Sequence, residues 1–219
     1  MTGTRAFERR RSDVVAGLVG LSGLAICGFI VRDGSVGSFE RSIFESLNGL
    51  PDALEPPMRI AQLLGVLVVG PITAIVASAL RRWRLAAAAL LVTLGKLAAE
   101  RIVWQLVSRQ RPGVTEPNAI VRGGTPTTGA AFVSGHVILL TALAWVLAPY
   151  LRGGWRLAPW IVVALVSFTR IYLGAHNPLD VLGGICLGTA VGCAARLIVA
   201  VPSPEKAGTA ERPGLPSGS

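Results

Sequence analysis

The sequence contains little charge and few cysteines. Asp, Glu, Lys and Arg make up 15% of its 219 residues, whereas hydrophobic residues make up 52%, and the mean hydropathy is +0.59. These values exclude an ordinary soluble domain and are typical of a membrane protein. Three cysteines, Cys27, Cys186 and Cys193, all fall inside apolar stretches. None has a second ligand at suitable spacing, so we predict small core residues rather than disulfide halves or metal ligands.

The charge that is present is unbalanced, with a formal net charge of +9. The basic residues do not form one stripe, as they would in a protein that binds nucleic acid, but gather between the apolar stretches. They form four clusters: Arg5, Arg9, Arg10 and Arg11; Arg81, Arg82 and Arg84; Arg152 and Arg156; Lys206 and Arg212. A positive-inside bias explains this pattern better than nucleic-acid binding does.

Six apolar stretches are long enough to cross a bilayer, which takes ~20 helical residues. They lie near residues 14–31, 60–80, 85–107, 130–151, 157–175 and 179–200. The first is too long for a typical signal peptide and no cleavage site follows Val31, so we interpret it as a retained span. The sequence therefore predicts an all-α fold, a bundle of six transmembrane helices.

Six spans place both termini on one side, and all four basic clusters then share that side, which identifies it as cytoplasmic. We expect a multi-pass protein of the plasma membrane with a basic N-terminal segment (1–12), a six-span domain (13–200) and a disordered cytoplasmic tail (201–219). Residues 32–59, 108–129 and 175–178 then lie outside.

Two further segments predict structure. Residues 38–50 place Phe39, Ile43, Phe44 and Leu47 on one helical face, which indicates a helix along the outer membrane surface, either a lid that guides lipid or a passive interfacial helix. In the last stretch, Gly184, Gly188 and Gly192 recur at four-residue spacing, which predicts close helix packing.

Both histidines lie beside residues that suit phosphate chemistry. His136 follows Ser134-Gly135, near the start of the fourth span, where free backbone N–H groups favour a phosphate oxygen. Arg170 and His136 lie about 6 and 9 Å below the outer ends of their spans at helical rise, and Arg111 lies just outside the third span. We therefore expect one outer-leaflet cavity. The alternative for Arg170 is an ion pair with Asp180 that neutralises both.

The corner at His176 is more informative. Asn177 suits an N-cap, Pro178 the first helical position and Asp180 the third. Asp180 is then near enough to accept a hydrogen bond from the His176 ring, which would fix its tautomer and strengthen the other nitrogen as a nucleophile.

Taken in order, Arg111-Pro112, Ser134-Gly135-His136 and Arg170-x5-His176-x3-Asp180 resemble the three signature motifs of the type-2 phosphatidic acid phosphatase superfamily, over roughly residues 59–200. The resemblance implies a phosphatase that uses a phosphohistidine and needs neither metal nor cofactor. His176 would be the nucleophile, Asp180 its orienting group and His136 the acid and base. Arg111, Ser134, Gly135 and Arg170 would bind the phosphoryl oxygens.

The sequence departs from the family at three positions. Trp104 stands where the family's first motif begins with lysine, Val133 replaces a proline, and Thr169 replaces a serine. Arg101, Arg109 and Arg122 are candidates for the missing phosphate-binding cation. The pair Lys96 and Glu100, four residues apart, is interpreted as structural.

We therefore predict a membrane lipid phosphatase acting at the outer face on a polyprenyl diphosphate, a prenyl-phospho-sugar or a phospholipid phosphate. Its partners would be that lipid and the bilayer. The outer face favours polyprenyl diphosphate, as in the recycling of cell-wall carriers. The alternatives are a lipid phosphotransferase with the same intermediate, and a non-catalytic scaffold or transporter of the same fold. A transporter would place its polar residues near the bilayer midplane, whereas here, apart from Lys96, they gather toward the outer side.

Overall fold

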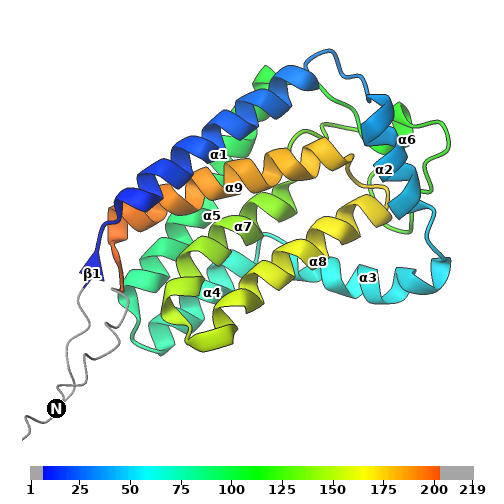
Figure 1. The fold of residues 1–219 in the computed structure, drawn as a ribbon. Helices are drawn as coiled ribbons and strands as arrows, with labels where there is room; N and C mark the ends of the chain where they lie inside the picture. The colour runs from blue at the N-terminus through cyan, green and yellow to red at the C-terminus, as the bar shows by residue number, and fades with distance from the viewer. Residues whose placement is uncertain (1–6, 203–219) are drawn as a thin grey trace, which may run out of the picture.

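The computed structural model describes residues 7–202, which form an elongated helical bundle (Figure 1). The mostly helical fold predicted from the sequence is confirmed. The bundle helices follow the six apolar stretches: α1 (Arg11–Ile30), α4 (Val69–Ala79), α5 (Trp83–Leu106), α7 (Gly135–Leu147), α8 (Ala158–Tyr172) and α9 (Pro178–Val199).

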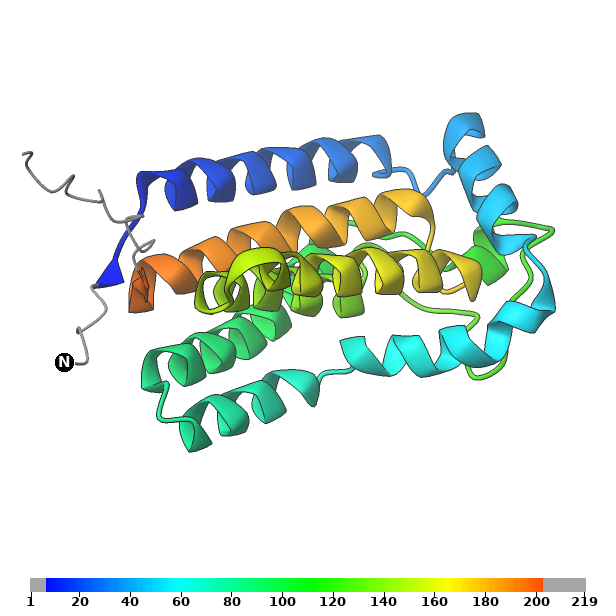
Figure 2. The ribbon, with the colours of Figure 1, turned by 60° about the horizontal axis from the view of Figure 1, so that its bottom comes forward.

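Short elements cap the two ends of this bundle. One end carries α2 (Ser38–Asn48), α3 (Glu55–Ala61) and α6 (Pro112–Thr115), while β1 (Phe7–Glu8) and β2 (Val201–Pro202) pair antiparallel at the other (Figure 2). The described part of the chain also contains four 3-10 turns: η1 (Asp52–Leu54), η2 (Gln62–Gly65), η3 (Ala148–Tyr150) and η4 (Gly153–Leu157). Arg5, Lys206, Arg212 and most of the predicted tail lie outside the described residues.

Within residues 7–202, two helices, α1 and α9, are by themselves long and apolar enough to cross a membrane. The predicted second span is broken, since the helical segments Asp52–Gly65 and Val69–Ala79 meet at an angle of 60°. The predicted fourth span begins later than expected because Ser134 is the extended N-cap of α7. Residues 130–133 before it instead form a non-helical approach to the N-terminus of that helix.

Helix α9 packs against α1 on one side and α7 on the other. The glycine row predicted to allow close packing does so against α7. A Cβ at Gly188 would lie 2.6 Å from the Ile138 carbonyl oxygen, and one at Gly192 would lie 2.9 Å from that of Ala142. At Gly184 the neighbour is the Ser134 carbonyl oxygen, at 3.0 Å. This contact fixes the start of α7 against the start of α9, where the sequence motifs lie.

The outer surface of the bundle is apolar along its length. Large hydrophobic side chains are exposed on every outer helix, among them Leu18, Val19, Ile75, Leu94 and Ile161. A water-soluble monomer rarely exposes so large a contiguous apolar surface, whereas a bilayer solvates it. Two of the three cysteines, Cys27 and Cys193, are buried in the interior.

Helix α2 is docked on the protein by a face that overlaps the predicted one only in part. Glu40, Phe44 and Asn48, spaced four residues apart, are buried, whereas Phe39 is 80% exposed. The Asn48 side chain donates to the carbonyl oxygens of Ile120 and Tyr172, at 2.9 Å each. The sequence pattern showed only the apolar members of this face and missed its two polar members.

Candidate active site

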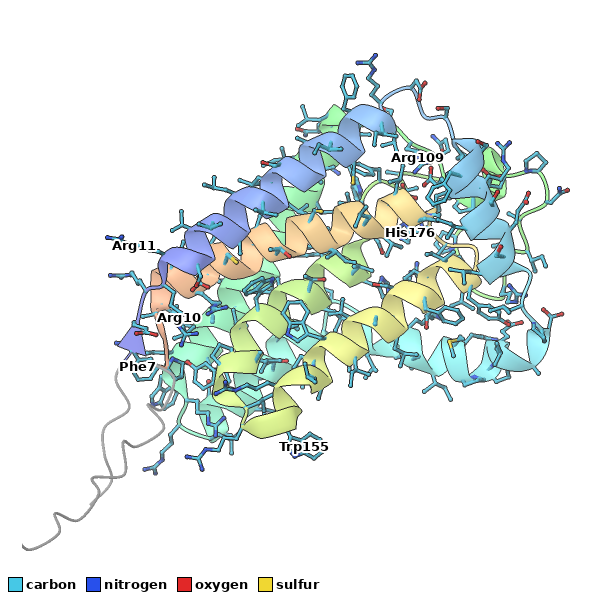
Figure 3. The ribbon with its side chains drawn as sticks, in the orientation of Figure 1. Phe7, Arg10, Arg11, Arg109, Trp155 and His176 are labelled. Carbon is cyan, nitrogen blue, oxygen red and sulfur yellow. The ribbon has the colours of Figure 1, made fainter. Side chains whose placement is uncertain are left out.

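A cavity of about 440 Å³ lies between the segment that follows α5 and the starts of α7 and α9. Five of the seven predicted catalytic and phosphate-binding residues line it: Arg111, Gly135, His136, Arg170 and His176. His176 and Arg109 lie at the end of the bundle that carries α2, far from Arg10 and Arg11 at the other (Figure 3). The predicted convergence of the motifs is therefore present in the fold.

His176 lies in the tight turn between α8 and α9, and its backbone N–H donates to the Arg170 carbonyl oxygen at 3.2 Å. Its Nδ1 lies 3.0 Å from the carbonyl oxygen of Ala131. A carbonyl can only accept, so Nδ1 carries the proton and Nε2 keeps a free lone pair. Burial, reinforced by Arg170 and Arg111, holds the pKa of His176 well below its usual value of 6.5. The ring is therefore neutral at physiological pH, as a nucleophile requires.

Asp180 occupies the third position of α9 as predicted, but it does not accept a hydrogen bond from His176. The distance from His176 Nδ1 to Asp180 Oδ2 is 3.9 Å, which is too long for one. Both carboxylate oxygens have other donors: the Asn177 backbone N–H at 2.8 Å and Arg109 Nη1 at 2.9 Å. Asp180 therefore acts on the histidine through its charge and through the turn that it closes.

Arg109 is enclosed by carboxylates, which removes it as a candidate for the missing phosphate ligand. Its guanidinium donates to both oxygens of Glu40, at 3.0 and 2.6 Å, as well as to Asp180. Glu40 also accepts from the backbone N–H of Leu179 at 2.8 Å. All three charged side chains are buried. This Glu40–Arg109–Asp180 network joins α2, the segment between α5 and α6, and the start of α9 into one support for the His176 turn.

The start of α7 presents unpaired donors near the cavity. Ser134 donates its N–H to the Asp180 carbonyl oxygen at 3.0 Å, and the first bond of the helix runs from Ile138 to Ser134. Within residues 7–202, the N–H groups of Gly135, His136 and Val137 make no hydrogen bond. The Ser134 hydroxyl is buried without a partner. Such a helix N-terminus favours an anion.

Two arginines face the cavity with donors to spare. Arg170 Nη1 donates to Gln62 Oε1 at 2.8 Å, and Arg111 Nη1 donates to the Ala175 carbonyl oxygen at 3.0 Å. The Nε groups of both are buried without a partner. The alternative in which Arg170 pairs with Asp180 is wrong, because Asp180 pairs with Arg109 instead.

The other candidates for a phosphate-binding cation lie elsewhere. Arg122 donates to the carbonyl oxygens of Asn48, Tyr172 and Leu50 at 2.6 to 2.9 Å and pairs with Asp52 at 3.0 Å, so it anchors the loop between α6 and α7. Arg101 is exposed on α5 and does not belong to the lining of the cavity.

Sequence reasoning missed several residues of this region. Gln62, Lys96 and Glu100, which the sequence did not assign to the site, line the cavity with the motif residues and with Trp104. Glu40 belongs to the network behind the cavity. The predicted ion pair between Lys96 and Glu100 is present, at 2.7 Å. A signal was available, because paired charges in an apolar stretch mark a polar cavity as often as a structural pair.

The arrangement suits transfer of a phosphoryl group. It combines a neutral histidine with a free Nε2, a second histidine, two arginines and a helix N-terminus, all directed to one cavity. Among residues 7–202, no three His, Cys, Asp or Glu side chains lie together as a metal site would need.

Comparison with known sequences agrees with this geometry. The family model described as the PAP2 superfamily matches residues 83–202. A decaprenylphosphoryl-5-phosphoribose phosphatase of Mycobacterium tuberculosis is 35% identical over 91 residues, 42% of this chain and 48% of that protein. A lipid A 4'-phosphatase of Porphyromonas gingivalis is 39% identical over 64 residues, 28% of this chain and 26% of that protein. The matched region thus spans less than half the length of these relatives.

Two solved structures share the fold. A PAP2-type phosphatidylglycerolphosphate phosphatase from Bacillus subtilis matches with a TM-score of 0.67 at 20% identity, over 83% of this chain and 94% of its own. Aquifex aeolicus LpxE matches with a TM-score of 0.61 at 21% identity, over 73% of this chain and 95% of its own. At these identities the two structures establish the fold alone.

Proposed function

Because the chain belongs to the PAP2 superfamily, we propose that it is an integral-membrane lipid phosphatase working through a phosphohistidine at His176, without a metal ion. The main support for this proposal is the composition of the cavity. It combines a histidine whose Nδ1 is engaged at 3.0 Å by a carbonyl oxygen with a second histidine and two arginines. The two similar proteins are named as phosphatases. The groups that such a reaction needs are present at the cavity and beside it.

In the first step, Nε2 of His176 attacks phosphorus. The N–P bond forms while the bond from phosphorus to the leaving oxygen breaks. His136, protonated once the phosphate dianion is bound beside it, gives its proton to that oxygen. Arg111, Arg170 and the N–H groups at the start of α7 hold the phosphoryl oxygens, where charge develops. The ring of His176 becomes positive, and the buried carboxylate of Asp180, 3.9 Å away, stabilises that charge.

In the second step, water attacks the phosphohistidine and His136, now neutral, takes a proton from it. The N–P bond breaks, inorganic phosphate leaves, and Nε2 of His176 regains its lone pair. The hydrogen bond to the Ala131 carbonyl keeps the ring in one orientation through both steps. Fixed orientation lowers the entropic part of the barrier for each attack.

The membrane arrangement follows from the apolar surface and the charge distribution. We propose that α1, the bent pair α3–α4, α5, α7, α8 and α9 form six spans within residues 13–200. Helix α2, whose exposed Phe39 points away from its buried face, would lie at the interface. The clusters around Arg10, Arg81 and Arg152 would lie in the cytoplasm with both termini, and the cavity would open outward.

The substrate class is a lipid carrying a terminal phosphate. A polyprenyl diphosphate, a prenyl-phospho-sugar and a phospholipid phosphate all present such a group at the outer leaflet. The M. tuberculosis relative, named for a decaprenylphosphoryl-5-phosphoribose substrate, supports the prenyl-linked members of this class.

The test is phosphate release by the purified protein from a panel of these three lipid classes, in detergent containing EDTA. Metal-independent release from at least one class is expected. Loss of turnover in EDTA that a divalent ion restores would contradict the metal-free mechanism. Product analysis with and without an acceptor lipid separates hydrolysis from phosphotransfer, since a transferase would form a new phosphorylated lipid.

A further inference from the structure

The ion pair between Lys96 and Glu100 opens into the cavity. The two side chains lie one turn apart on α5 with Lys96 Nζ 2.7 Å from Glu100 Oε2, and both are nearly buried, at 12% and 10% exposure. They line the same cavity as His136 and Arg170. A pair that merely neutralised itself in an apolar span could lie on any face of α5, so this placement calls for a separate explanation.

The pair also touches the start of α7. A Cβ built at Gly135 would collide with Glu100 Oε1 and lie 2.9 Å from Lys96 Nζ. A side chain at this position would have to displace the ends of Glu100 and Lys96. The ammonium group therefore stands beside the first helical residue of α7, where the free N–H groups of Gly135 and His136 are found. A cation beside a helix N-terminus is unfavourable unless an anion lies between them. In the structure that anion is the Glu100 carboxylate.

We propose that Lys96 is a phosphoryl-binding residue of this site and that Glu100 is its positioning residue; the inference rests on the proposed phosphatase function. When substrate enters, a phosphoryl oxygen takes the place of the Glu100 carboxylate as the partner of Lys96. The site then has three cations on the phosphoryl group: Arg111, Arg170 and Lys96. The Glu100 charge leaves the lining with a net charge near +2, which matches a phosphomonoester dianion.

The Lys96 cation enters from deeper in the bundle than the motif position Trp104, which lies eight residues further along α5, or about 12 Å at helical rise. Trp104 lines the cavity as well but carries no charge. Among the candidates named from the sequence, Arg109 and Arg122 are held by other partners and Arg101 is outside the cavity lining. Lys96 is thus the third basic side chain of the lining, beside Arg111 and Arg170.

The experiment compares variants by KM, kcat, competitive inhibition by inorganic phosphate and thermal stability in detergent. The key variant is the charge-free double substitution Lys96→Met with Glu100→Gln. It leaves no unpaired buried charge, so it should fold as well as the unmodified protein. Losing one charge-assisted hydrogen bond should raise KM and the inhibition constant of phosphate ~10- to 100-fold. The single variant Lys96→Arg keeps the cation, so it should retain most of the phosphate affinity that the double variant loses.

The single variant Glu100→Gln should change phosphate affinity in the opposite direction. It removes the carboxylate that competes with phosphate, so phosphate should bind as tightly as before or more tightly, with a lower stability from the unpaired Lys96. If the pair were purely structural, neutralising Lys96 or neutralising Glu100 should reduce function to the same extent. The control is Arg11→Met, an exposed cation at the far end of the bundle, which should change neither constant.

A double variant with unchanged KM and phosphate inhibition would overturn the role of Lys96 while leaving the phosphatase function intact. An unmodified protein that releases no phosphate from any lipid would instead contradict the proposed function. In that case, equilibrium binding of inorganic phosphate to the same variants still decides the inference, since loss of Lys96 must weaken it.

Discussion

His176 Nδ1 lies 3.9 Å from Asp180 Oδ2, while the carbonyl oxygen of Ala131 takes the hydrogen bond of the ring. The histidine and the carboxylate are thus coupled by charge and by the turn rather than by direct contact. Asp180 in turn is held by Arg109, and Arg109 by Glu40. The first consequence concerns Glu40, which lies on α2 and does not line the cavity.

Glu40→Gln should lower the stability of the protein and reduce its turnover rate. The substitution leaves the buried Arg109 with one carboxylate in place of two, and breaking a buried pair costs about 3–5 kcal/mol when no compensation occurs. Thermal unfolding in detergent and steady-state kinetics measure both effects. Glu45→Gln on the same helix is the matched control, because Glu45 is exposed. Equal behaviour of the two variants would show that the network does not support the His176 turn.

Arg101→Ala should change turnover by less than threefold, since its side chain is exposed and lies outside the cavity lining. A loss of ~10²–10³-fold, the usual effect of removing one transition-state donor, would instead make Arg101 the missing cation. Trp104→Lys should raise phosphate affinity, because it places an ammonium group at the cavity lining. Steady-state kinetics on the same lipid measures both variants.

The ring of His176 should remain neutral below pH 6.5. Burial, with Arg170 and Arg111 nearby, lowers its pKa well below that value. Lowering the pH therefore leaves the nucleophile active until the depressed pKa is reached. Below pH 6.5 the unfolded chain binds a proton that the folded chain excludes. The contribution of this residue to the free energy of unfolding therefore decreases as the pH is lowered.

NMR of labelled histidine in the His136→Gln variant reads this pKa directly, because the sequence contains two histidines and one reporter then remains. A chemical shift that is flat between pH 7 and 6 is expected. A titration midpoint at or above pH 6.5 would refute the buried, neutral ring.

The orientation is tested by single cysteines placed at the two ends of the bundle. Thr128→Cys, on the exposed outer loop, should react with an impermeant maleimide added to intact cells. Gly154→Cys, where an added Cβ meets nothing within 4 Å, should react only after the membrane is opened. The reverse pattern would move the cavity to the cytoplasmic side and exclude an outer-leaflet substrate.

The sequence predicted the helices and the convergence of the motifs because both depend on local chemistry. Apolar stretches of spanning length specify helices, and Asn177, Pro178 and Asp180 specify the start of α9. The glycine row from Gly184 predicted a close contact that α7 fills.

What the sequence could not predict depends on partners distant in the chain. Glu40 pairs with Arg109, which lies 69 residues further along the chain, and no local sequence pattern indicates that pairing. The hydrogen bond from His176 to Ala131 required the position of the segment before α7. The four-residue spacing of Lys96 and Glu100 suggested a structural pair, and only the cavity shows that the pair lies beside His136. The hydropathy pattern does not show the 60° bend before α4.

The central claim is a covalent phosphoryl group on His176. Rapid quenching with ³²P-labelled lipid phosphate, followed by alkaline digestion, should trap label on a peptide that contains His176. The His176→Ala variant should trap none and turn over no substrate. The His136→Ala variant should still form the phosphoenzyme slowly when the leaving group is good, because it loses the proton donor and keeps the nucleophile. Label on His136, or full turnover by His176→Ala, would contradict the account.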